Sequence, residues 1–168
     1  MTIKVGDRLP AGKLYEFNET EGPGCPVGPR EIDVQELTRG KKVVFFGLPG
    51  AFTPTCSAKH VPSYVQNIDA LKRKGVDEVV CISVNDAFVM GAWARDQKAT
   101  GKVRMMGDGS GTYTKPLGLE LDLNARGMGT RMQRFSMLVD DGVVKTLNIE
   151  GPGKFEVSDA DTMLKQLG

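Results

Sequence analysis

Two short runs of consecutive apolar residues dominate the hydropathy pattern of this chain: VVFFGL at 43–48 and VVCISV at 79–84. Continuous apolar runs of this length are typical of strands that are buried on both faces of a sheet. A weaker run at 103–106 predicts a third strand. Two further segments, 134–139 and 143–149, flank a DDG turn and predict an antiparallel hairpin.

Helical spacing of apolar residues appears between these strands. The segment 54–74 predicts one long helix, since its apolar positions fall on one face: Val61, Tyr64, Val65, Ile68 and Leu71. Pro62 lies inside this helix and is expected to kink the axis near Ala58. A second helix is expected after a cap at Asn85 or Asp86, with Phe88, Val89, Ala92 and Trp93 on its apolar face. A last helix, 159–167, is expected to be capped by Ser158.

The remaining segments carry weaker patterns. Residues 112–117 predict a short helical turn, and 119–131, with two glycines, is expected to be mainly loop. Residues 21–29 are rich in Pro and Gly and predict an irregular surface loop that holds Cys25. Strands alternating with helices predict an α/β fold with a mostly parallel sheet, which the final hairpin makes mixed. This order matches the thioredoxin-like fold, with a central mixed sheet flanked by helices.

Composition limits the classes of function. A chain of 168 residues is most simply one domain, expected here over 1–168. The net charge of +1 argues against a nucleic-acid binder. The longest apolar run is too short to span a membrane, and the N-terminal segment has no apolar core of a secretory signal, so a cytoplasmic location is expected. Three irregularly spaced cysteines, no CxxC and a single histidine predict neither a disulfide framework nor a metal site, and no cofactor is expected.

One cysteine occupies a position that favours chemistry. Thr53 is a good N-cap and Pro54 suits the first helical position, which places Cys56 in the first turn of the helix. Unpaired backbone N–H groups and the positive end of the helix dipole favour a thiolate there. Such a nucleophile could attack a peroxide oxygen, a disulfide sulfur or an acyl carbon. Disulfide exchange usually requires a second thiol at the position that Thr53 occupies. Acyl transfer usually requires a histidine base, and His60 is the only histidine in the chain. His60 either tunes the thiolate or makes a structural contact.

The sequence around this cysteine resembles a known family. PGAFTPTC contains the PxxxTxxC signature of peroxiredoxins as Pro49, Thr53 and Cys56. The resemblance extends through 81–93 and 134–150, and it is closest to the type II, or type V-like, atypical group. It implies that Cys56 attacks the O–O bond and becomes a sulfenic acid, that Thr53 hydrogen-bonds the thiolate and the peroxide, and that Pro49 shields the sulfur. It also implies an active-site arginine, for which Arg134 is favoured by the start of its strand and by the family pattern, with Arg131 as a competing candidate.

The resemblance leaves the second thiol open. Some atypical members carry a resolving cysteine between the last strand and the last helix, but the corresponding segment here, GPGKFEVSDAD, has none. Cys81, within a predicted strand, and Cys25, in the loop, are the remaining candidates. We therefore expect a one-cysteine mechanism in which glutathione, with or without glutaredoxin, or thioredoxin reduces the sulfenic acid.

The partners expected from the resemblance are a peroxide substrate, one of these thiol reductants and a second copy of the chain in a homodimer, with no nucleic acid and no membrane. Trp93 and Phe52 either line a substrate pocket or serve as core or dimer contacts. The competing functions are a peroxide sensor or chaperone-like module and a thiol transferase that lacks its second cysteine.

Overall fold

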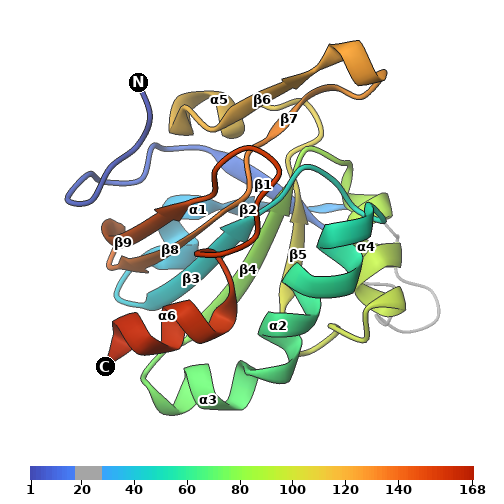
Figure 1. Ribbon diagram of the computed structural model, residues 1–168. Helices are drawn as coiled ribbons and strands as arrows, with labels where there is room; N and C mark the ends of the chain where they lie inside the picture. Colours follow the sequence, from blue (N-terminus) through green and yellow to red (C-terminus); the bar gives the residue numbers. More distant parts are fainter. Residues whose placement is uncertain (18–27) are drawn as a thin grey trace.

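The computed structural model describes residues 1–17 and 28–168. Its main sheet has seven strands, in the spatial order β2 (Arg30–Asp33), β1 (Lys13–Glu16), β5 (Arg104–Gly107), β4 (Glu78–Ser83), β3 (Lys42–Gly47), β8 (Phe135–Asp140) and β9 (Val143–Ile149). β3, β4 and β5 run parallel, and the other pairs are antiparallel. The predicted mixed α/β sheet is confirmed, with its apolar runs in the central strands (Figure 1).

The helical segments are α1 (Val34–Thr38), η1 (Cys56–His60), α2 (Val61–Gln66), α3 (Ile68–Arg73), α4 (Ala87–Asp96), α5 (Thr114–Leu117), η2 (Asn124–Arg126) and α6 (Ala160–Leu167). Within residues 1–17 and 28–168, none of the helices is both long and apolar enough to cross a bilayer.

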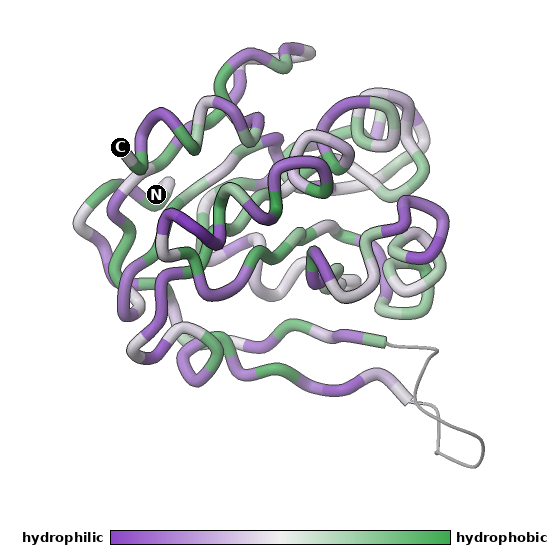
Figure 2. Tube along the Cα trace, turned by 90° about the horizontal axis from the view of Figure 1, so that it is seen from below, coloured by the Kyte–Doolittle hydropathy of each residue, from purple (hydrophilic) through white to green (hydrophobic). Residues whose placement is uncertain are grey.

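Each face of the sheet is buried under its own layer. Alternate residues of β3 point to opposite faces, so Val43 and Phe45 join one hydrophobic cluster and Val44 and Phe46 join the other. The first cluster packs under α1 and α5, and the second packs under α2, α3, α4 and α6. Burial on both faces explains why the central strands carry unbroken apolar runs, visible as hydrophobic stretches through the middle of the molecule in Figure 2.

Several expectations from the sequence are corrected. Residues 119–131 form not a loop but a two-stranded hairpin, β6 (Glu120–Leu123) and β7 (Gly129–Met132), set apart from the main sheet at the top of Figure 1. The single helix expected over 54–74 is interrupted at Asn67, which has non-helical backbone angles. Asp159, not Ser158, caps α6, because the Asp159 carboxylate accepts from Thr162 N. The expected loop at 21–29 lies mostly outside the described residues.

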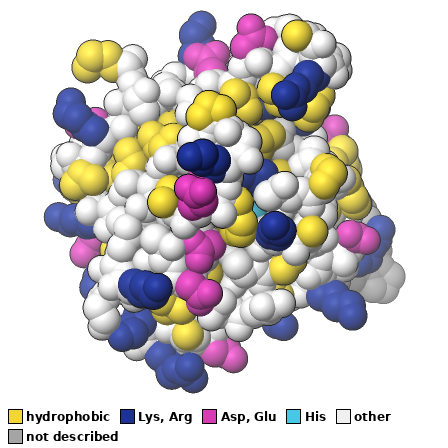
Figure 3. Space-filling model, viewed as in Figure 1, with side chains coloured by type: hydrophobic (Ala, Val, Ile, Leu, Met, Phe, Trp, Pro, Cys, Tyr) yellow, Lys and Arg dark blue, Asp and Glu magenta, His cyan; other side chains and the backbone are white. Residues whose placement is uncertain are grey.

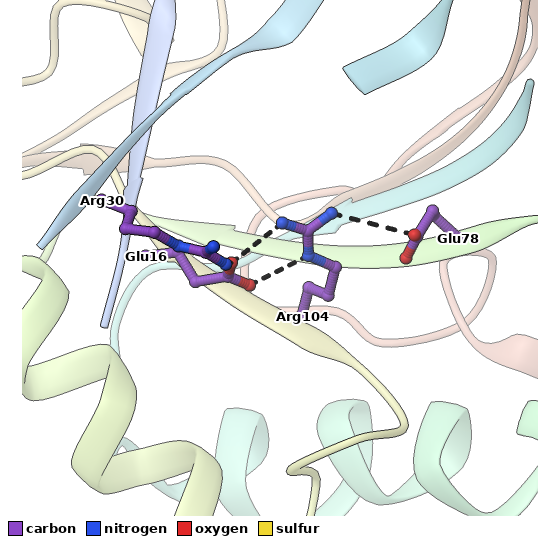
Figure 4. A network of polar contacts seen from close by, with 4 residues as sticks. All are labelled: Glu16, Arg30, Glu78 and Arg104. Atoms are coloured by element: carbon purple, nitrogen blue, oxygen red, sulfur yellow. Dashed lines mark hydrogen bonds and ion pairs between the residues drawn. The ribbon is translucent and has the colours of Figure 1, made fainter. Parts of the chain in front are cut away.

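The sequence pattern gave no indication of β1, β2 and α1. β1 pairs with β5 over only two residue pairs, Tyr15 with Gly107 and Glu16 with Met106. A partly buried ion pair reinforces this short ladder: the Arg104 guanidinium donates to both carboxylate oxygens of Glu16, at 3.0 and 2.9 Å (Figure 4). Arg104 also lies near Glu78 of β4 at 3.8 Å, so it links three neighbouring strands.

Candidate active site

Cys56 lies at the carboxyl end of β3, where the chain turns into a helix. The helix begins at Pro54, as the sequence predicts, and the Cys56 side chain is fully buried. Thr53 marks the start of the helix, since its carbonyl accepts the hydrogen bond from Ser57 N at 2.9 Å. This end of a central strand is where open α/β sheets hold their ligands.

The first turns of this helix are wider than an α-helix. Residues Cys56–His60 form a π-helical segment, in which Val61 N donates to the Cys56 carbonyl five residues earlier. Pro62 follows at once, and a proline has no N–H to give to the carbonyl four residues before it, at Ala58. The irregularity expected near Ala58 therefore takes the form of a π-bulge, a feature that is frequent at functional sites.

Arg134 brings a cation to the sulfur from the neighbouring strand. The antiparallel register pairs Gly47 of β3 with Phe135 of β8, so Arg134 stands beside the end of β3. Its Nη2 donates to Cys56 Sγ at 3.1 Å, and its Nη1 lies 2.9 Å from His60 Nδ1. A donor in this position stabilises negative charge on the sulfur.

His60 is buried and neutral. Burial, followed by the neighbouring Arg134 cation, lowers the pKa of His60 from 6.5 to about 3. Its Nε2 lies 3.1 Å from the Ser158 carbonyl, which can only accept, so the ring proton sits on Nε2 and the lone pair of Nδ1 faces Arg134. His60 therefore contacts the arginine, and its Nδ1 lone pair is committed there instead of serving as a base for the thiol.

The loop before the helix carries Pro49 and Thr53. The Thr53 hydroxyl donates to the Gly50 carbonyl at 2.7 Å instead of accepting from a helix amide, so its oxygen keeps the capacity to accept a hydrogen bond. Ala51 N donates to Asn85 Oδ1 at 2.9 Å, which anchors the loop to the end of β4. Pro49 is half-buried at the rim of the site.

The two candidate arginines have different contacts. Arg131 donates through Nε to the Met128 carbonyl at 2.8 Å, and its Nη1 lies 3.4 Å from both the Pro49 and the Val84 carbonyls. It thus ties the Pro49 loop to β7. Arg134, in contrast, reaches the sulfur itself.

A pocket of about 460 Å³ opens over this site. Figure 3 shows the face hollowed near its centre, with charged and hydrophobic side chains around the hollow. Pro49, Thr53 and Arg134 all line the pocket, while Cys56 lies buried beside them. The β6–β7 hairpin contributes three apolar residues to the lining, Leu121, Leu123 and Met128, together with Arg126. The sequence pattern predicted a loop here, and these residues were not among the expected site residues.

The other two cysteines are not alike. Cys81 is fully buried in the middle of β4, paired with Phe46 on one side and Met105 on the other, and burial followed by the neighbouring Cys56 raises its pKa. Cys56 and Cys81 are both unbonded thiols. Cys25 lies outside the described residues.

Trp93 and Phe52, the two aromatic residues considered for the substrate pocket, differ in burial: Trp93 lies in the core and Phe52 on the surface. Trp93 is buried and donates through Nε1 to Ser57 Oγ at 3.1 Å, whereas Phe52 is 53% exposed. Trp93 therefore belongs to the core beside the site, and Phe52 does not line the pocket described above.

Comparison with known proteins identifies the family. The redoxin family profile matches residues 4–164. Peroxiredoxin-2B of Arabidopsis thaliana is 48% identical over 165 residues, which cover 98% of each chain. A crystal structure of reduced Prx3 in complex with H2O2 from Vibrio vulnificus is 47% identical with a TM-score of 0.91, and covers 99% of this chain and 100% of that one.

A chain from Burkholderia cenocepacia, provisionally described as a thioredoxin reductase, is 57% identical with a TM-score of 0.96 over 100% of this chain and 99% of its own. Its description differs from those of seven curated relatives of this chain, all of which are named as peroxiredoxins. The family profile, these relatives and the fold agree with the PxxxTxxC resemblance, and the chain belongs to the peroxiredoxins, the thiol-dependent peroxidases of the redoxin family.

Proposed function

We propose that Cys56 is the thiol that reduces the peroxide. The observation that carries this proposal is the 3.1 Å contact between Arg134 Nη2 and Cys56 Sγ, made by an arginine that lines the same pocket as Thr53. The thiolate attacks one peroxide oxygen, the O–O bond breaks, and Cys56 becomes a sulfenic acid. The other oxygen leaves with its electron pair and takes up a proton, giving water or an alcohol.

The neighbouring groups suit each part of this step. The Arg134 guanidinium donates to the thiolate and to the oxygen on which charge develops. The hydroxyl oxygen of Thr53 can accept a hydrogen bond from the peroxide O–H, since its own proton is donated to the Gly50 carbonyl. Pro49 covers the sulfur at the pocket rim, and the Cys56 backbone N–H in the first helical turn adds a further donor.

The pocket supports hydrogen peroxide and small alkyl hydroperoxides as substrates. Thr53 and Arg134 supply polar groups to its lining, and Leu121, Leu123 and Met128 supply apolar contact for an alkyl group. The Vibrio vulnificus relative was solved with H2O2.

Steady-state assays with hydrogen peroxide and cumene hydroperoxide test the assignment. We expect Cys56→Ser to abolish turnover of both substrates, while Cys81→Ser keeps it. Retained turnover in Cys56→Ser would refute the site. Oxidation of Cys56 with no recycling by any thiol would instead favour a sensor.

We further propose a one-cysteine mechanism with an external thiol. The segment 151–161 contains no cysteine. Cys81 is fully buried, and burial raises the pKa of its thiol, which disfavours the thiolate that would attack a sulfenic acid. The external thiol attacks the sulfenic sulfur, releases water and leaves a mixed disulfide, which a second thiol then reduces. Glutathione with glutaredoxin, or thioredoxin, would supply these thiols.

Mass spectrometry after one equivalent of peroxide tests this mechanism. We expect a trappable sulfenic acid on Cys56 and, after addition of glutathione, a mixed disulfide on Cys56. An intramolecular disulfide from Cys56 to Cys81 or to Cys25 would overturn it. Parallel assays with glutathione, glutaredoxin and thioredoxin then identify the reductant.

A homodimer is also proposed. Phe52 and Phe88 leave more than half of their side chains exposed near the site, at 53% and 51%, and Phe88 packs on Phe17 with ring centroids 4.9 Å apart. Association through these rings would remove apolar surface from water. Sedimentation equilibrium over a range of concentrations measures it, and a monomer throughout would exclude the dimer.

A further inference from the structure

His60 is a fully buried polar residue to which the proposed chemistry assigns no step. It lies four residues after Cys56, yet its recorded polar contacts are with Arg134 and Ser158. Its Nδ1 accepts from Arg134 Nη1 at 2.9 Å, and its Nε2–H donates to the Ser158 carbonyl at 3.1 Å. The imidazole thus bridges the arginine that holds the sulfur and the segment between β9 and α6.

That segment, 150–158, is folded around one buried carboxylate. Glu150, 9% exposed, accepts hydrogen bonds from three backbone amides, Glu156 N, Val157 N and Ser158 N, and from the Ser158 hydroxyl. Its own backbone N–H donates to the Arg134 carbonyl at 2.9 Å. The segment therefore begins beside Arg134 and crosses the middle of the view in Figure 1. Near its end, the Ser158 carbonyl lies against His60.

A ring from the same segment completes the surroundings of the arginine. Phe155 lies with its centroid 5.9 Å from the Arg134 guanidinium carbon and 5.0 Å from the His60 ring. A cation over an aromatic face at this distance is attracted to it. The guanidinium is thus bounded by Cys56, His60 and Phe155.

We propose that His60 is a positioning residue for Arg134: its Nδ1 fixes one arm of the guanidinium, and the 150–158 segment fixes His60, so that the other arm points at the Cys56 sulfur. This rests on the role proposed above for Cys56 and Arg134. A guanidinium is planar and rigid, so an acceptor on Nη1 sets the direction in which Nη2 points.

A neutral imidazole suits this task better than a carboxylate. Arginines commonly pair with Asp or Glu, but a carboxylate here would offset the positive charge of Arg134 and weaken its attraction for a thiolate. The imidazole accepts a hydrogen bond and adds no charge. The charged groups that face His60 are Arg134 directly and Glu150 through Ser158, and both favour the tautomer with its proton on Nε2.

Two substitutions at His60 separate its two contacts. In His60→Asn the amide oxygen stands near the position of Nδ1 and keeps an acceptor for Arg134. In His60→Gln the amide nitrogen stands near the position of Nε2 and keeps the donor to Ser158, with no acceptor at Nδ1. The measurement is the second-order rate constant for oxidation of Cys56 by hydrogen peroxide, followed by rapid quench and mass spectrometry.

We expect His60→Gln to lower this rate constant about ten- to a hundredfold, the size of one lost hydrogen bond to a charged group, and His60→Asn to lower it less. Tyr64→Phe is the matched control, because the Tyr64 hydroxyl donates to the same Ser158 carbonyl at 2.9 Å without contacting Arg134. It should lose stability and keep a rate near that of the wild type. A His60→Gln rate equal to or above that of His60→Asn would overturn the proposal.

A double-mutant cycle with Arg134→Ala distinguishes positioning from a general structural role. If His60 acts through Arg134, His60→Gln has no further effect on the rate in the Arg134→Ala background. An equal loss in both backgrounds would refute the proposal. Should His60→Gln not fold, Glu150→Gln tests the same link from the other end of the segment, with the same expected cycle.

The cycle also separates this proposal from the one on which it rests. If Arg134→Ala alone keeps the wild-type rate, the role of Arg134 fails whatever His60 does. If Arg134→Ala is slow but His60→Gln is as fast as the wild type, only the positioning role fails.

Discussion

At the scale of residues, the site is an assembly of hydrogen bonds around one buried sulfur. The Cys56 sulfur accepts a hydrogen bond from Arg134 Nη2, and Arg134 Nη1 donates to His60 Nδ1. Thr53 gives its proton to Gly50 and keeps its lone pairs for a ligand. The sequence predicted Pro49, Thr53 and Cys56 as site residues from a motif at fixed spacing, and Arg134 from a strand start together with the family resemblance. The structure brings these four residues together at one pocket. It did not predict that His60 would contact the arginine instead of the cysteine.

The two arginines near the site should therefore behave differently. We expect Arg134→Ala to lower the rate constant for peroxide by about two to three powers of ten, as for the loss of a donor to a developing oxyanion. Arg131→Ala removes contacts to the Pro49 and Val84 carbonyls and none to the sulfur, so we expect a loss of about tenfold or less. Stopped-flow kinetics of the reduced enzymes measure both. Equal losses would show that the Sγ contact is not what matters.

At the scale of elements, the helix around Pro62 was predicted from local sequence patterns, whereas the hairpin 120–132 was not. Proline predicted a disturbance near Ala58, and the π-bulge over 56–60 agrees. The break at Asn67 has no comparable local cause. The β6–β7 strands have four residues each and lie outside the main sheet, so their alternation of Leu121 and Leu123 with acidic residues was too short to outweigh the glycines.

The attachment of the outer strands β1 and β2 to the rest of the sheet depends on one buried charge. Glu16 is 4% exposed and accepts two hydrogen bonds from Arg104, whereas Glu31 on the neighbouring β2 is about half exposed and pairs with Lys13. We expect Glu16→Gln to lower the free energy of unfolding by about 1–3 kcal/mol, less than for a fully buried pair because Arg104 keeps some contact with water. Urea denaturation measures this loss.

The control for that variant is Glu31→Gln, from an exposed pair on the same hairpin. Its expected effect is below about 0.5 kcal/mol. A large loss in Glu31→Gln, or none in Glu16→Gln, would contradict the argument from burial.

At the scale of the whole molecule, the fold couples stability to pH through two buried groups. The folded chain holds His60 neutral with a pKa of about 3 against an ordinary 6.5, so below pH 6.5 the unfolded chain binds a proton that the folded chain does not. Glu150 acts in the same direction at lower pH. Burial raises its pKa, but hydrogen bonds from Ser158, Glu156 and Val157 outweigh burial and lower it below 4.5.

Acid should therefore destabilise the protein from pH 6.5 downward. We expect the free energy of unfolding to fall by up to about 1.4 kcal/mol per pH unit between pH 6 and pH 4.5, and more steeply below pH 4.5 as Glu150 is protonated. Denaturation curves at a series of pH values measure the slope. His60→Asn should flatten it above pH 4.5, and an unchanged slope in that variant would assign the titration to another group.

The sequence by itself determined the central strands, the start of the helix after β3 and the position of Cys56 at their junction. Each of these depends on neighbours in the chain: a continuous apolar run, a Thr-Pro start and a fixed PxxxTxxC spacing. These features are local, so their physical causes can be read along the chain.

Only the tertiary structure decided what surrounds the sulfur. The β3–β8 register brings Arg134 to Cys56 from 78 positions away, and the Glu150 carboxylate folds a distant segment so that Ser158 meets His60. Burial then keeps His60 neutral and keeps Cys81 inside β4. Such contacts follow from strand order and desolvation, which belong to the folded molecule and have no counterpart in any short stretch of its sequence.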